Sequence, residues 1–248
     1  MAGLLKYSEG TTLLHRANPL SKVLLALCIC VAVFLAPHPA VLMGIIGVEV
    51  LIGLYAGIGR ETLSLLSGLL GLGLVMCLVQ VLIIRDGTAI FLFVTDRGLS
   101  TGVLVALRLV AFAIPLVQML TLTRLTDLAN AAVEVLHVPY RYAFTITTAL
   151  RFVPIFADEM NKIVEAQTAR GVSFDEGGIF RRLRLMLPLA APLLISSVAK
   201  ADDTALAAEE RGFYLRTRSS SYKRYPFGAA DIVVFAVGIL IVAASIIL

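Results

Sequence analysis

Long apolar blocks separated by short polar connections dominate the pattern of this chain. The blocks cover roughly residues 20–36, 40–58, 62–84, 99–122 and 229–248. A membrane-spanning helix needs about 20 mostly apolar residues, because the hydrocarbon layer is about 30 Å thick. A membrane β-barrel would show many alternating segments of about ten residues, and the sequence lacks them. The pattern therefore predicts an all-α integral membrane protein with five transmembrane helices.

The segment 123–228 differs because its apolar positions form narrow stripes. Residues 125–135 carry apolar side chains at spacings of three and four, which predicts a short amphipathic helix. Longer helices are expected over about 140–170 and 180–211, the last with a kink at Pro188 and Pro192. The expected stripes are Phe152, Phe156, Met160, Ile163, Gln167 and Arg170 on the first long helix, and Leu187, Ala191, Leu194, Val198, Ala201, Ala205 and Ala208 on the second.

Charge placement orients these regions. The segment 123–228 holds 14 of the 21 Lys and Arg residues, and Lys6, Arg16, Lys22 and Arg60 lie on the same predicted side. Since positive residues collect on the cytoplasmic side of a membrane, the N-terminus and this segment should be cytoplasmic and the C-terminus outside. Three regions are expected: four spans in 1–122, cytoplasmic or membrane-proximal helices in 123–228, and a final span in 229–248.

Composition supports the membrane assignment and excludes most chemistry. The chain is 59% hydrophobic and 15% charged, whereas soluble domains have about 45–50% apolar and about 25% charged residues. The three histidines are scattered along the chain, and no phosphate-binding loop, Gly-x-Ser-x-Gly or His-Glu-x-x-His motif occurs. We therefore expect no catalytic residue, no metal site, no cofactor and no nucleic-acid partner.

Both long helices should end in arginine followed by glycine, at Ala169-Arg170-Gly171 and Glu210-Arg211-Gly212. One interpretation is local, because an arginine at a helix C-terminus complements the helix dipole by about 0.3–1 kcal/mol. The other is that two such ends insert into grooves of a cytosolic partner, where each guanidinium would bind carboxylates in a bidentate manner. The matched pair favours the second interpretation.

The paired ends resemble the X-Arg-X signatures of energy-coupling-factor T components, the EcfT/CbiQ/BioN family. Other stretches resemble that family in the same order, and the resemblance covers essentially the whole chain. They are His15-Arg16-Ala17-Asn18-Pro19-Leu20-Ser21-Lys22, Pro139-Tyr140, Ala149-Leu150-Arg151-Phe152-Val153-Pro154, and Arg181-Arg182-Leu183-Arg184 with Leu187-Pro188 and Pro192-Leu193.

The resemblance implies a non-catalytic coupling subunit of an ECF-type ABC importer in a bacterial or archaeal cell membrane. Its partners would be two ABC-type ATPase subunits, a membrane-embedded substrate-binding S component and the lipid bilayer. The family implies that the two Arg-centred tripeptides dock into the ATPases and pass ATP-driven motion to the S component for uptake of a vitamin or metal ion. Glu210 departs from the family, which commonly has a small residue there.

Several alternatives stay open. The chain could be a T component dedicated to cobalt, nickel or biotin, although its N-terminal segment looks closer to shared, vitamin-serving T components. It could be the permease of an ordinary ABC importer, since Glu165-Ala166 before Gly171 faintly echoes a coupling loop. An intramembrane enzyme would use Glu49, Arg108 or a histidine. Glu49 and Arg108 could also pair, or Arg108 could make a structural hydrogen bond.

The topology is testable by cysteine labelling in a variant that lacks the native cysteines. Cysteines placed near residues 38 and 90 should react with an impermeant reagent added outside the cell, and one near residue 175 should not. This result follows from the asymmetric distribution of Lys and Arg. The reverse pattern of accessibility would contradict the predicted orientation.

Overall fold

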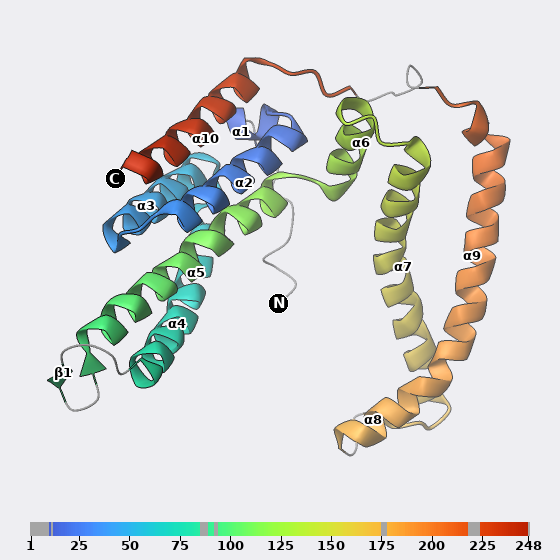
Figure 1. Cartoon of the computed structure of the whole chain (residues 1–248). Coiled ribbons are helices and arrows are strands. Elements are labelled where there is room, and N and C mark those ends of the chain that lie inside the picture. Colours follow the sequence, from blue (N-terminus) through green and yellow to red (C-terminus); the bar gives the residue numbers. More distant parts are fainter. Residues whose placement is uncertain are drawn as a thin grey trace. The chain divides into compact units, whose positions relative to one another are not determined.

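The structure is a computed structural model that describes residues 10, 12–84, 89–91, 94–174, 178–217 and 224–247 (Figure 1). Its contacts divide the chain into two units, one formed by residues 1–136 and 225–248 and the other by 137–224. Both units are helical, apart from one small hairpin in the first unit, and the predicted all-α class is confirmed.

All five apolar blocks form helices, and these lie in the first unit. Two short helices and an antiparallel hairpin accompany them. The elements are α1 (Leu13–Arg16), α2 (Pro19–Leu35), α3 (Pro39–Tyr55), α4 (Gly59–Ile83), β1 (Ala89–Phe91), β2 (Val94–Thr95), α5 (Asp96–Leu122), α6 (Leu125–Val135) and α10 (Ala229–Ile247).

Length and composition support membrane insertion. Helices α4, α5 and α10 are long and apolar enough to cross a membrane, whereas α2 and α3 are apolar but have 17 residues each. The stretch Leu183–Glu210 in the second unit also qualifies, although we predicted it to be cytoplasmic or membrane-proximal. If that stretch crossed the membrane, cysteines at residues 175 and 214 would label from opposite sides.

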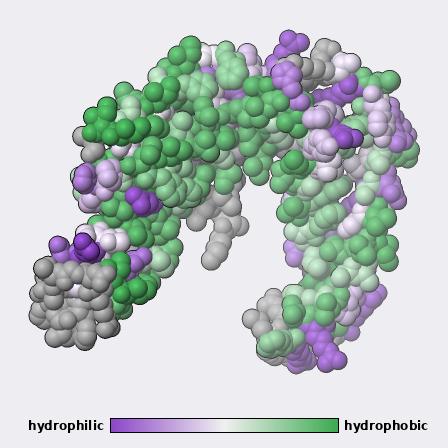
Figure 2. All heavy atoms as spheres, in the orientation of Figure 1, coloured by the Kyte–Doolittle hydropathy of each residue, from purple (hydrophilic) through white to green (hydrophobic). Residues whose placement is uncertain are grey.

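Helix α5 is central to the first unit because it packs against α2, α3 and α4, while α10 packs along α2. The core between them contains Ile29, Val33, Leu42, Ala111 and Val234. Large apolar side chains also cover the outside of α4, including Leu74 and Leu82. Figure 2 shows hydrophobic side chains over the surface of these helices, as expected for a protein whose solvent is lipid.

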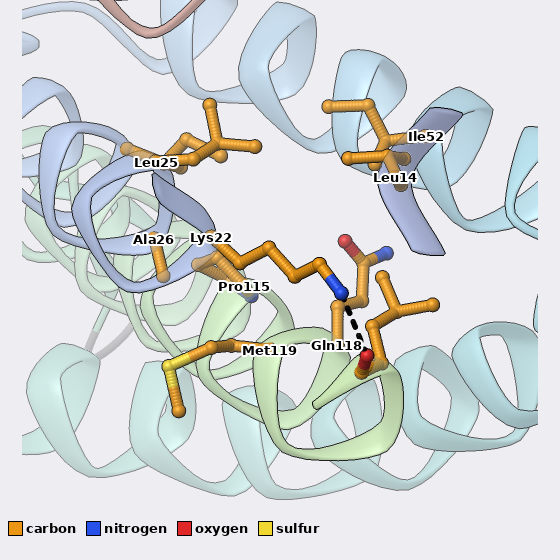
Figure 3. Close-up of a pocket in the computed structure, with 10 residues that line it drawn as sticks. Leu14, Lys22, Leu25, Ala26, Ile52, Pro115, Gln118 and Met119 are labelled. Carbon is orange, nitrogen blue, oxygen red and sulfur yellow. Dashed lines mark hydrogen bonds between the residues drawn. The ribbon is translucent and has the colours of Figure 1, made fainter. Parts of the chain in front are cut away.

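Polar residues join the helix ends of the first unit. Lys22 is buried, and its Nζ donates to the backbone oxygens of Leu122 at 3.0 Å and His15 at 3.3 Å (Figure 3). The side-chain oxygen of Asn18 caps α2, and the Asn18 backbone N donates to Asp231 Oδ1 at 2.8 Å. The N-terminal segment with His15, Asn18 and Lys22 therefore connects α2 with the end of α5 and the start of α10.

Tyr225 extends this junction to α6. Its backbone N donates to Glu134 Oε2 at 2.8 Å, and its hydroxyl donates to Asp127 Oδ1 at 2.9 Å. Its backbone oxygen accepts from Asn18 Nδ2 at 2.8 Å. Burial and the hydrogen bond to Asp127 raise the pKa of Tyr225, so its phenol stays a neutral donor.

The second unit contains α7 (Tyr140–Ala169), α8 (Ile179–Met186), the 3₁₀ turn η1 (Leu187–Leu189), α9 (Ala190–Glu210) and the 3₁₀ turn η2 (Phe213–Leu215). Both long helices form where the sequence predicted them, and the interruption expected at Pro188 is the turn η1. Helices α7 and α9 lie side by side (Figure 1). They are antiparallel, because Phe213 contacts Tyr140 while Ser196 contacts Glu159.

The stripe predicted on α7 is confirmed from Phe152 to Gln167, whose members are partly buried, whereas its last member, Arg170, is exposed. The seam predicted on α9 is wrong, because Leu194, Val198 and most of its other members are exposed. The partly buried positions of α9 are Leu193, Ser196, Ser197, Lys200, Thr204 and Ala208. Polar contacts of Ser196 and Lys200 with α7 turn the apolar face of α9 outward. The spacing of apolar residues along the sequence does not reveal such contacts.

Glycines control the close approach of α4 and α5. A Cβ added at Gly102 would lie 3.0 Å from both the backbone oxygen and the sulfur of Cys77, and one at Gly73 would lie 3.4 Å from Ala106. Gly68 and Gly71 of α4 differ from Gly73, because a Cβ at either position would meet nothing within 4 Å in the described part of the chain.

The substitution Gly102→Ala should destabilise the protein by about 1–3 kcal/mol, because the added methyl group forces α4 and α5 apart. Gly71→Ala is the matched control, since its methyl group meets open space and alanine favours a helix by up to about 1 kcal/mol. Thermal unfolding in detergent measures both. Equal effects of the two substitutions would contradict the role of Gly102 in packing.

Candidate functional site

The first arginine-glycine end closes α7 with a Schellman motif. Ala169 is the last helical residue, Arg170 is the C-cap, and Gly171 has a φ of +92°. The backbone N of Gly171 donates to Thr168 O at 2.9 Å, and that of Val172 donates to Gln167 O at 3.1 Å. Glycine adopts this left-handed conformation at little cost, which is why the sequence Arg-Gly ends the helix there.

The second end, on α9, also has an arginine C-cap followed by a left-handed glycine. Glu210 is the last helical residue, Arg211 is the C-cap, and Gly212 has a φ of +69°. The backbone N of Gly212 donates to Glu209 O at 2.9 Å. The C-cap dihedral angles are also alike, with φ and ψ of −87° and 7° at Arg170 and −82° and 7° at Arg211. The two arginines therefore have the same C-cap conformation, and each is followed by a left-handed glycine.

Helix α3 provides an internal comparison. It ends with Ala56 and Gly57, where Gly57 has a φ of +78° and the backbone N of Ile58 donates to Gly53 O at 3.0 Å. This is the same capping motif without an arginine. The motif alone is sufficient to end a helix in this protein, so Arg170 and Arg211 are not required for it.

Both arginines are exposed, and in the described ranges neither guanidinium has a hydrogen-bond or ion-pair partner. Ala169 and Glu210 are exposed as well. Because α7 and α9 are antiparallel, Arg170 and Arg211 lie at opposite ends of the pair. Thirty residues of helix separate these ends by about 45 Å. Within the second unit, the two exposed arginines are thus kept apart.

An aromatic cluster supports the end at Arg211. Phe213 packs with its ring centroid 4.8 Å from Phe144 and 5.4 Å from Tyr140, both at the start of α7. The guanidinium of Arg216 lies 3.7 Å from the centroid of the Tyr140 ring. These residues and Arg211 line an open pocket of about 530 Å³. Sequence reasoning missed this cluster, although the spacing of Tyr140 and Phe144 by four residues was a signal for it.

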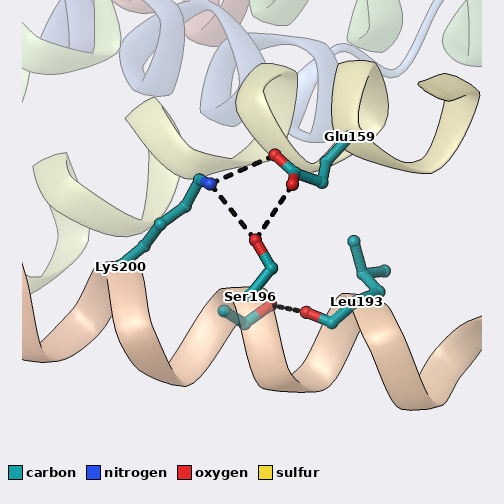
Figure 4. A network of polar contacts seen from close by, with 5 residues as sticks. Glu159, Leu193, Ser196 and Lys200 are labelled. Carbon is teal, nitrogen blue, oxygen red and sulfur yellow. Dashed lines mark hydrogen bonds and ion pairs between the residues drawn. The ribbon is translucent and has the colours of Figure 1, made fainter. Parts of the chain in front are cut away.

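A polar network fastens α9 to the middle of α7 (Figure 4). Lys200 Nζ lies 3.1 Å from Glu159 Oε2, Ser196 Oγ donates to Glu159 Oε1 at 3.0 Å, and Lys200 Nζ donates to Ser196 Oγ at 3.2 Å. The hydrogen bonds from Lys200 and Ser196 lower the pKa of the Glu159 carboxyl. The network fixes which face of α9 meets α7.

Comparison with known proteins finds relatives over most of the chain. Residues 10–222 match the CbiQ family, described as cobalt transport protein. A relative from Exiguobacterium sibiricum, named energy-coupling factor transporter transmembrane protein EcfT, is 31% identical over an alignment of 260 positions that covers 96% of each chain. The protein of that name from Bacillus subtilis is 30% identical and covers 96% of this chain and 94% of its own. The one from Lacticaseibacillus paracasei is 33% identical over 84% and 83% of the two chains.

The chain belongs to the CbiQ family of energy-coupling factor T components. As a T component it is a multi-pass bacterial membrane protein, in agreement with its apolar helices. The relatives are named as transmembrane components of a transporter, which are generally not enzymes.

Arg108 and Glu49 of this T component lie within its apolar helices α5 and α3. Arg108 Nη2 donates to the backbone oxygen of Ala36 at 3.0 Å, the structural hydrogen bond we considered. The pair with Glu49 does not form. The Glu49 carboxylate is fully buried and has no hydrogen-bond partner in the described part of the chain. No cluster of histidine, cysteine and acidic side chains in the described ranges could hold a metal ion.

The substitution Glu159→Gln should loosen α9 from α7 and speed amide hydrogen exchange around residues 196–204, because Lys200 loses its ion pair. Glu165→Gln is the control, since Glu165 is exposed and makes no hydrogen bond or ion pair with the described residues. The pKa of Glu159 is lowered in the folded state, so the network stabilises the pair above the ordinary carboxyl pKa and is lost as the pH falls through the lowered value. Equal exchange rates in the two variants would contradict this role.

Proposed function

We propose that this T component is the coupling subunit of an energy-coupling factor importer. In this proposal, Arg170 and Arg211 dock into two ABC-type ATPase subunits, and the α7–α9 pair passes their ATP-driven motion to a membrane-embedded substrate-binding S component. The observation that carries the proposal is the pair of exposed arginines on matched glycine-capped helix ends, neither with a partner among the described residues.

Local charge argues against a purely stabilising role. Apart from the C-cap arginine, neither helix has a basic residue in its last turn, and α9 ends with Glu209 and Glu210. Acidic side chains at a helix C-terminus oppose the helix dipole. The residues at the end of α9 are therefore not those that would best stabilise the helix. Its arginine is better explained by binding to carboxylates on a partner.

The separation of the two ends supports two docking sites. A single groove on one ATPase subunit could not hold both arginines, since about 45 Å of helix lies between them. Two subunits that approach and separate during ATP turnover could hold one end each. The Glu159–Lys200–Ser196 network would then make α7 and α9 move together.

We propose that the cargo is a micronutrient, either a vitamin or a metal ion. The family description mentions cobalt transport, while the names of the relatives mention no cargo. The N-terminal segment resembles T components shared by several vitamin-binding S components. Purification of the intact complex and mass spectrometry of its S components would distinguish a shared T component from a dedicated one.

We also propose that the N-terminus of the chain lies inside the cell and the C-terminus outside.

Reversal of charge at either end should weaken binding of the ATPases. Removal of one partner of a buried ion pair costs roughly 2–5 kcal/mol, so Arg170→Glu or Arg211→Glu should lower ATPase binding or uncouple hydrolysis from uptake. The double variant should lose the ATPases while its abundance in the membrane stays normal, because both side chains are exposed. Pull-down of the ATPases and uptake assays measure this.

Lys162→Glu is the matched control for charge, since Lys162 is an exposed cation on the same helix as Arg170. It should keep both ATPases. A role limited to helix capping predicts a loss below about 1 kcal/mol for the arginine variants, with the complex intact. A double variant that binds its ATPases and transports like the natural protein would overturn the proposal.

A further inference from the structure

Helix α8 exposes large apolar side chains next to arginines. Phe180 is 86% exposed, Leu183 63%, and Leu187, which follows directly in η1, 68%. At 100° per residue, these three positions fall within one narrow stripe of the helix. The opposite side is partly buried through Leu185 and Met186. The exposed stripe is therefore not a core face of the second unit.

Arg181 and Arg184 lie on one side of this stripe, with Arg184 nearer to it. They are exposed, lie one turn apart, and make no hydrogen bond or ion pair with the described residues. Helix α8 itself contains no acidic residue. Figure 2 shows hydrophilic and hydrophobic side chains next to one another at the α8 end of the second unit. An apolar stripe with a basic edge is the pattern of a helix that lies in a membrane interface.

The chemistry of this surface favours anionic lipid as its occupant. An acyl region covers the apolar stripe, and a phosphate group binds the guanidinium fork. The stretch Leu183–Glu210 is also apolar enough for membrane contact, and Leu194 and Ile195 continue the exposed apolar surface into α9.

We infer that α8 is an interfacial anchor for anionic lipid, in which Phe180, Leu183 and Leu187 insert among acyl chains while Arg181 and Arg184 bind headgroup phosphates. The inference goes beyond the coupling role and does not depend on it, because neither Arg170 nor Arg211 takes part. The anchor would hold the start of the α8–α9 segment at the bilayer surface. The basic edge makes the anchor depend on lipid charge, and each arginine contributes about a fivefold factor to binding an anionic surface.

The absence of tryptophan from the sequence allows a direct test. In the variant Phe180→Trp, the new residue is the only tryptophan, and the full chain can be reconstituted in vesicles of acyl-brominated phosphatidylcholine with or without phosphatidylglycerol. Its fluorescence should be quenched by the brominated chains, and more strongly when phosphatidylglycerol is present. Leu74→Trp in the apolar helix α4 is a positive control, and its quenching should not depend on phosphatidylglycerol.

The arginines are tested in the Phe180→Trp background. The double substitution Arg181→Gln and Arg184→Gln should abolish the extra quenching caused by phosphatidylglycerol, since it lowers anionic-surface binding by roughly 30-fold. The pair Arg181→Lys and Arg184→Lys should retain it. Three results would overturn the inference. The first is quenching in the Leu74→Trp variant without quenching in the Phe180→Trp variant, and the second is quenching in the Phe180→Trp variant that does not change with phosphatidylglycerol. The third is a tryptophan at position 180 that becomes shielded from solvent only when partner subunits are added.

Discussion

The buried amino group of Lys22 and the amide of Asn18 hold the helices of the first unit at their ends. Lys22 binds the last carbonyl of α5, and Asn18 binds Asp231 at the start of α10 and the backbone of Tyr225. Apolar contacts between membrane helices allow sliding and rotation because lipid tails are as apolar as the helices themselves. Directional hydrogen bonds in a buried position fix one arrangement, and here they do so where three helices meet.

This junction also brings together the two points of the first unit from which the chain continues into the second. The chain leaves the first unit after α6 and returns at Tyr225, and these two points are linked because Tyr225 donates to Glu134 and to Asp127 of α6. Both covalent connections of the second unit therefore start from one hydrogen-bonded place. In the proposed coupling function, force on the α7–α9 pair would reach α2 and α10 through these residues.

Within the second unit, backbone conformation determines where the long helices end, and side-chain contacts hold these helices together. Left-handed glycines end α7 and α9 and place Arg170 and Arg211 on matched scaffolds. The Glu159–Lys200–Ser196 network and the aromatic contacts of Phe213 hold the two helices together between those ends. This division leaves both guanidiniums exposed, and it leaves an apolar surface on α8 and α9 that a helix pair in water would bury.

Local features of this protein could be predicted from its sequence. Apolar blocks of sufficient length became helices, Pro188 became part of a 3₁₀ turn, and both Arg-Gly pairs became glycine-capped ends. Each of these depends on residues that are neighbours along the chain. The family likewise followed from motifs in a fixed order, which comparison confirmed.

Contacts between distant residues were decided only by the tertiary structure. Periodicity placed an apolar seam on α9, but the polar contacts of Lys200 and Ser196 with Glu159 turned that seam outward. Composition allowed Glu49 to pair with Arg108, yet Arg108 binds the carbonyl that follows α2 instead. The sequence by itself determined where helices begin and end, because capping and hydrophobic length are local. Which faces meet depends on a few directional bonds between residues far apart in the chain, and these exist only after the helices have packed.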